Sequence, residues 1–266
     1  MRDIADADFA DRDAAAIEFH IILIACFDLD ITTPVEASVG ENVTITAGGN
    51  VKVNVNSEES LRALAIAGSG GLLAGAGAYG RVANAGARSA SLRTGVNITS
   101  ANAVNVISNH TADFLATSGS GTIGLAVAGI SGANVSSAAK VEAFTQDVSI
   151  GSDLNRVGNI NINATSDINN NRNGRMAHAV GVSGGVITAT GTDARASINP
   201  EVVASIGANS NVYSNGAVNV IGLADQEAKA AALGIDVGIA AFGATFATSV
   251  IDPNVQAVVG DRTVIV

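Results

Sequence analysis

Histidine and aspartate are the residues of this chain best suited to catalysis or metal binding, and they are widely spaced. His20, His110 and His178 have no partner at the H-x-x-x-H or Cys spacing that a zinc site needs. They also lack the neighbours of a catalytic triad. We therefore expect no metal site and no triad, and we interpret each histidine as a surface or strand residue.

Three aspartates, Asp147, Asp153 and Asp167, come nearest to a carboxylate cluster. Glycosidases need two convergent acids, and we expect all three aspartates at turns, where Asp is favoured by its own hydrogen bonds to the backbone. The chain has no Trp and two Tyr, so it offers few aromatic surfaces on which sugar rings could stack. The sequence therefore predicts no catalytic residue and no enzyme. A carbohydrate-active β-helix is kept as an alternative.

Ligand-binding motifs are equally sparse. The stretch "SDINNNRNGR", residues 166–175, is rich in oxygen atoms that suit calcium, but it lacks the G-G-x-G-x-D repeat of a calcium roll. Its favoured interpretation is a turn, with calcium as the alternative. The stretch "GSGGLLAGAG" has neither the Lys nor the helix start of a phosphate loop. We expect no cofactor.

Composition argues for small side chains arranged in layers. Of 266 residues, 47% are hydrophobic but only 3% aromatic, and 30 are Gly. A compact globule of this size normally fills its centre with larger side chains. The net charge of -10, with only three lysines, argues against nucleic acid as a partner.

The first 33 residues differ from the rest. They contain eight of the acidic residues and end in an apolar run, "IEFHIILIACF", residues 17–27. This run is too short to span a membrane and follows an acidic lead, so we predict neither a membrane span nor an export signal in this chain. Residues 1–33 are interpreted as an acidic cap or non-repeat segment. Cys26 is expected to be a small buried hydrophobe.

A repeat of about 55 residues organises residues 34–266. The pattern in "PVEASVGENVTITAGGNVKVNV" from Pro34 returns from Pro200 and in part from Pro253. Its V-x-V or I-x-I core recurs at Val51, Val104, Ile160 and Val218. About four units follow one another, and the chain stops midway through a fifth, which we interpret as a fragment of a longer protein.

Each unit predicts strands. The cores alternate with period two and are rich in β-branched residues. A second block, such as "AGSGGLLAGAGA", alternates Ala and Gly around a Gly/Ser pivot, and its many glycines disfavour helix. A short helix in "DQEAKAAALG", from Asp225, is an alternative for that segment.

We therefore predict an all-β fold, a parallel β-solenoid in which each unit supplies two or three rungs. The alanine blocks would let neighbouring layers approach closely. The alternative is antiparallel hairpins that turn at the "GSGG" and "VSGG" pivots, so that the alanine blocks form long paired arms.

The recurrence of "VEASVG", "GGNVKVNV" and "SGGLLAGAGA" resembles the repeats of very large secreted bacterial surface proteins, of the leukotoxin-like filamentous adhesin type and the haemagglutinin-type β-solenoids. The resemblance covers about residues 34–266. It implies an extracellular stalk or adhesive filament at the cell surface and carries over no catalytic residues.

Two structural functions follow as predictions. The first is a stalk or adhesive filament whose partners are host or neighbouring-cell surfaces. The second is a fibre subunit whose exposed strand edges recruit copies of itself.

Overall fold

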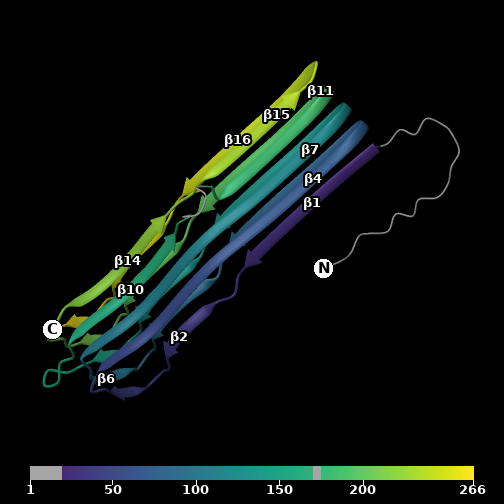
Figure 1. The fold of residues 1–266 in the computed structure, drawn as a ribbon. Helices are drawn as coiled ribbons and strands as arrows, with labels where there is room; N and C mark the ends of the chain where they lie inside the picture. The colour runs from purple at the N-terminus through teal and green to yellow at the C-terminus, as the bar shows by residue number, and fades with distance from the viewer. Residues whose placement is uncertain (1–19, 170–174) are drawn as a thin grey trace, which may run out of the picture.

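The computed structural model describes residues 20–169 and 175–266, and this part of the chain is an all-β parallel solenoid (Figure 1). Sheet A contains β1 (His20–Ile31), β4 (Asn50–Asn84), β7 (Ala103–Ser137), β10 (Asn159–Ile168), β11 (Ala177–Ile198), β14 (Val218–Gln226), β15 (Ala230–Val237) and β16 (Ala240–Ile251). Sheet B contains β2 (Val35–Val39), β5 (Ala87–Leu92), β8 (Lys140–Thr145), β12 (Glu201–Ile206) and β17 (Asn254–Val259). Sheet C contains β3 (Thr44–Thr46), β6 (Asn97–Ser100), β9 (Ser149–Ile150), β13 (Asn211–Val212) and β18 (Val264–Ile265).

Each sequence repeat forms one complete coil. Val51 pairs with Val104, Val104 with Ile160, and Ile160 with Val218, so the repeat anchors are stacked in register. The predicted solenoid is confirmed, but two or three rungs per unit is wrong. A unit makes only one rung because most of its residues lie in a single long excursion along sheet A.

This excursion folds back on itself within each coil. In β7, Ser118 and Ser131 lie thirteen residues apart, yet their Oγ atoms are 2.7 Å apart. In β4, Asn84 Nδ2 donates to Glu59 Oε2 at 2.6 Å across twenty-five residues. Each long strand therefore has an outgoing arm and a returning arm, and the two arms face each other as two layers.

A column of glycines makes the reversal possible. Gly71 pairs with Gly124, and Gly124 with Gly185, at the tips of successive coils. A Cβ atom on Gly124 would lie 1.9 Å from the carbonyl oxygen of Gly71, and one on Gly185 would lie 2.2 Å from that of Gly124. Only glycine permits this close approach of neighbouring coils.

The alternative of antiparallel hairpins is therefore wrong, although it anticipated the arms. Every strand pair in the described residues is parallel and joins one coil to the next. The backbone hydrogen bonds run along the stack, so the two arms of one coil meet through side chains. The short helix considered after Asp225 is also wrong, since β14 continues to Gln226 and β15 begins at Ala230.

Two regions result, which we call the base and the blade. The base is the part enclosed by sheets B, C and the start of each outgoing arm, and its core is formed by valine, isoleucine and leucine with some alanine. The blade is the two-layered outer part of the arms. It comprises residues 20–27, 63–80, 116–133, 177–194 and 230–247.

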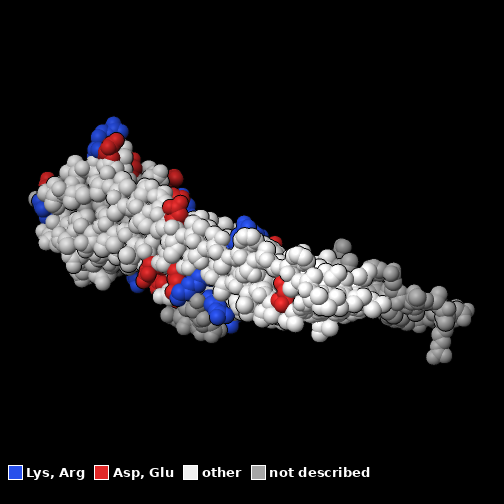
Figure 2. Space-filling model, turned by 90° about the horizontal axis from the view of Figure 1, so that it is seen from above, with Lys and Arg blue, Asp and Glu red and all other residues white. Residues whose placement is uncertain are grey.

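The described chain is wider than it is deep. Sheets B and C each have five strands, which at about 4.8 Å spacing gives a stack about 24 Å deep. One arm of about 20 residues is about 65 Å long at about 3.3 Å per residue. Figure 2 shows the broad end and the middle carrying the charged side chains, while the described part of the narrow end is nearly free of them. No helix among the described residues is long and apolar enough to cross a membrane.

The parallel stack begins before the predicted boundary at residue 34. β1 pairs with the returning arm of β4, from His20 opposite Leu73 to Ile31 opposite Asn84. The acidic cap or non-repeat segment predicted for residues 1–33 stays a prediction, and residues 1–19 lie outside the described residues. Cys26 is exposed, contrary to its predicted burial, because it occupies an outward position on an edge strand.

Candidate functional site

The histidines do not come together. His110 is buried on the inner face of β7, whereas His178 lies at an outward position of β11 with its Nε2 3.0 Å from Nη1 of Arg175. Burial and the positive charge of Arg175 both lower the pKa of His178. The side chain of His20 lies outside the described residues.

The three aspartates lie on separate elements. Asp147 is in the turn between β8 and β9 with φ 48°, and Asp153 is in the loop after β9, 3.9 Å from Arg156. Asp167 was expected at a turn but lies within β10, where it pairs in register with Asp225. Burial and then the charge of Asp225 raise the pKa of Asp167. This arrangement does not form a catalytic pair.

The asparagine-rich stretch is an insertion. β10 pairs with β7 at an offset of 56 residues (159 with 103), and β11 pairs with β7 at an offset of 61 (177 with 116), so five residues are added between them. The calcium alternative falls largely on residues 170–174, which lie outside the described residues. Among the described residues, no group of three or more His, Cys, Asp or Glu side chains could hold a metal ion.

A buried polar cluster lies between the base and the blade. Arg88 of β5 is fully buried and donates to Glu59 on the outgoing arm of β4 and to Asn84 on its returning arm. Ser57 Oγ donates to Glu59 Oε1 at 3.0 Å. Arg88 is closed to solvent, and the side chain of Glu59 is 15% exposed. Because these two charged groups pair with each other, the cluster ties the two arms together and offers little to a ligand.

His110 borders this cluster, and its environment keeps it neutral. Its Nε2 lies 3.5 Å from Asn84 Nδ2. Desolvation by burial, followed by the charge of Arg88, lowers the pKa of His110 to about 4, although Glu59 acts in the opposite direction. His110 is therefore uncharged at neutral pH, which spares the cluster a second buried positive charge.

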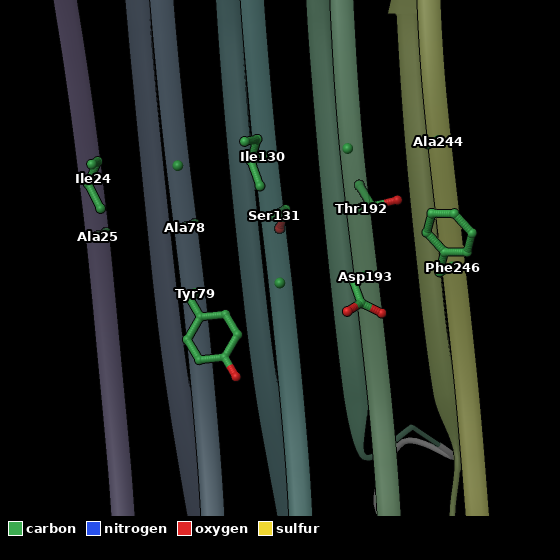
Figure 3. A pocket seen from close by; sticks show the side chains of 13 residues that line it. Ile24, Ala25, Ala78, Tyr79, Ile130, Ser131, Thr192, Asp193, Ala244 and Phe246 are labelled. Carbon is green, nitrogen blue, oxygen red and sulfur yellow. The ribbon is translucent and has the colours of Figure 1, made fainter.

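An apolar groove lies on the outer face of the returning arms of the blade (Figure 3). Strand pairing places five residues in each of two rows that cross the coils. One row is Ile24, Gly77, Ile130, Gly191 and Ala244. The next is Cys26, Tyr79, Gly132, Asp193 and Phe246. Large residues thus stand beside glycines, and the surface is corrugated.

The groove has a volume of about 490 Å³ and an almost wholly apolar lining. Figure 3 shows the rings of Tyr79 and Phe246 on either side of it, with Asp193 between them. A Cβ atom on Gly132 would lie 2.7 Å from the Tyr79 ring, so this ring lies across the glycine. Asp193 is paired with Arg195 at 2.9 Å. The arrangement suits apolar contact and holds no pair of groups for acid–base chemistry.

Sequence reasoning missed both Arg88 and the groove. Arg88 and Glu59 each occupy an inward position of an alternating strand, and such charges are buried only when paired. The groove depends on the register between coils, but the alternation of Leu64 and Ile66 with alanines that point inward already placed large side chains outside. The V-N-V and I-N-I cores also contained the signal for an asparagine ladder, Asn105–Asn161–Asn219. In this ladder Asn161 Nδ2 donates to Asn105 Oδ1 at 2.9 Å, and Asn219 Nδ2 donates to Asn161 Oδ1 at 2.8 Å.

No protein-family model, no curated protein and no solved structure matches this chain.

Proposed function

We propose that this chain is a structural and adhesive repeat segment of a secreted bacterial surface protein, located outside the cell, where it acts as a stalk or filament. The observation that supports this most is the register. Each coil stacks on the preceding one with its anchor residues aligned, so the fold is extended by adding a unit. Each added unit of about 55 residues lengthens the stack by about 4.8 Å.

Contacts would be made by the arms and the loops at the corners of the coils. These elements present repeated side chains at the spacing of the strands, which suits weak contacts that gain strength by repetition. The deep core positions are occupied by aliphatic side chains that serve packing. The role is therefore one of length, stiffness and display.

An adhesion assay tests this function. Beads coated covalently with the chain should attach to cultured epithelial cells or to bacterial cells several-fold more than beads coated with the same chain after heat unfolding. Equal attachment of the two bead types would contradict the proposal. So would turnover of a polysaccharide that is lost when Asp147, Asp153 and Asp167 are changed to Asn, since it would favour an enzyme.

Assembly through strand edges is a second candidate. In the described residues β17 pairs with β12 alone, and all six of its side chains are exposed. The amide of Asn254 donates to Pro200, so in a parallel pair the amide of Ala257 points away from the fold. Ala257→Pro should therefore abolish edge-driven polymers, seen by light scattering, while leaving the coil intact. Polymers that persist in this variant would rule out assembly at this edge.

A further inference from the structure

The blade reverses the polarity expected of a protein layer in water. In the coils of β4, β7 and β11, every inward position of the blade is Ala, Gly, Ser or Thr, apart from Val127. Several of the inner hydroxyls bond to one another, as in the 2.8 Å contact of Thr190 with Ser183. The large apolar side chains point outward, with Ile66 68% exposed and Ile130 67% exposed.

This reversal leaves the blade with apolar surface that it cannot bury by itself. In the coils of β4, β7 and β11, nearly all exposed large apolar side chains belong to the blade or its tip, and Leu154, in a loop, lies outside it. The charged residues of the blade are Asp193, paired with Arg195, and Asp236, which accepts a hydrogen bond from Thr190. Contiguous apolar surface of this kind marks an interaction site.

The outer face of the returning arms, which we call the returning face, has the shape and size of a protein-binding surface. Hollows lie along it between Leu73 and Ile187, between Ile130 and Phe242, and at the groove beside Tyr79. Eight residues of arm and five strands cover about 26 by 24 Å, or about 600 Å². This matches the lower range of what each partner contributes to a specific interface, about 600–1,000 Å².

Lipid fits this face less well than protein does. The blade has open edges at β1 and β16, which each pair with one neighbour in the described residues. Unpaired backbone groups are not tolerated in the hydrocarbon layer of a membrane. The face also alternates large residues with glycines. Such a corrugated face fits a second corrugated sheet, whose large side chains can lie over the glycines, as in paired sheets that interdigitate.

We propose that the returning face of the blade is a docking surface for the returning face of a second copy of this chain. The large side chains of each copy lie in the hollows over the glycines of the other. This pairing uses sheet faces, and so it is distinct from assembly through strand edges and does not depend on the adhesive function.

Gly191→Leu tests the pairing without disturbing the fold. Gly191 lines both the groove and the neighbouring hollow, and a Cβ atom there would meet nothing within 4 Å. Gly119 is the matched control, because it is equally open but lies on the outer face of the outgoing arm, beside Ile66 and Val180. Gly119→Leu therefore adds the same side chain to the opposite face of the blade.

Sedimentation velocity over a range of concentrations, with circular dichroism to verify the fold, gives the readout. The original chain should form dimers, Gly191→Leu should weaken them at least tenfold, and Gly119→Leu should change the dissociation constant less than twofold. A chain that stays monomeric, or loses its dimers only in Gly119→Leu, would overturn the proposal. Association that is equal in all three proteins would also overturn it, because the strand edges would then be responsible.

A vesicle experiment tests lipid as the alternative occupant of the returning face. The chain should not co-sediment with phosphatidylcholine vesicles. Co-sedimentation that is lost in Ile130→Lys would assign the face to lipid and would contradict pairing with a second copy.

Discussion

The base and the blade are built from the same strands yet follow opposite rules. In the base, Val51, Val53 and Val55 point inward and alternate with Lys52 and Asn54, which face solvent. Farther along the same strand, Ala65 and Ala67 point inward while Ile66 faces outward. The alternation is unbroken, but the large apolar side chains have moved to the other face.

This difference shows that one strand can serve two kinds of packing. The base gains stability by burying aliphatic side chains within the chain, at roughly 25 cal/mol per Å². The blade holds its layers together with methyl groups and paired hydroxyls, which allow the two arms to lie close. Its large side chains are left for contacts with other molecules.

The largest expected effect is at the boundary between the two regions. Arg88→Met should lower the free energy of unfolding by about 3–5 kcal/mol, because it leaves Glu59 poorly solvated and unpaired. Urea denaturation measures it. Arg88→Met combined with Glu59→Leu should recover much of the loss, whereas a double variant as unstable as the single one would show that the pair does not act as a unit.

Two isoleucines, one in the base and one in the blade, should respond differently to truncation. Ile162 is fully buried in the base, and Ile162→Ala should cost about 2–4 kcal/mol of unfolding free energy. Ile66→Ala, on the outer face of the blade, should change it by less than about 0.5 kcal/mol. The same denaturation series measures both, at a concentration where the chain is monomeric. Similar losses would mean that Ile66 is buried after all.

The dependence of stability on pH should come from the boundary as well. Because the pKa of His110 is lowered to about 4 in the fold and is near 6.5 in the unfolded chain, the unfolded chain takes up the proton first as the pH falls. The contribution of His110 to the free energy of unfolding is therefore fully present above about pH 6.5, and it declines towards pH 4 by up to about 3 kcal/mol.

Urea midpoints between pH 7.5 and 4.5 measure this decline, and His110→Gln serves as the control that removes it. If the original chain and the variant lose stability in parallel over this range, His110 is not the titrating group.

Much of the fold could be predicted from the sequence. The spacing of Val51, Val104, Ile160 and Val218 gave the units and their register, because parallel stacking places equivalent residues of successive repeats beside each other. The number of rungs per unit could not be predicted, since an arm that continues and an arm that folds back share the period-two pattern. The glycines at 71, 124 and 185 marked the reversals, but not whether hydrogen bonds or side chains join the arms.

The candidate site was less predictable. Tyr79, Ile130 and Phe246 lie in three different coils and come together only through the exact offsets between strands. One residue inserted in a strand would turn its side chains to the other face of the sheet, so the three residues would no longer share a groove. The five-residue insertion near Asn169 also changes the offset along β7, and its effect on the alignment of the blade could not be anticipated.

A distance measurement across the blade shows whether the two arms of one coil face each other as two layers. Leu64 and Tyr79 are each replaced by Cys to carry a spin label, in a chain in which Cys26→Ser removes the native thiol. In a blade of two facing layers these positions lie opposite each other on the two outer faces, so the labels should be about 20 Å apart, given layers about 10 Å apart and the added label side chains. A distance of about 50 Å, the length of fifteen extended residues, would show a single extended arm that does not fold back, and would contradict a two-layered blade.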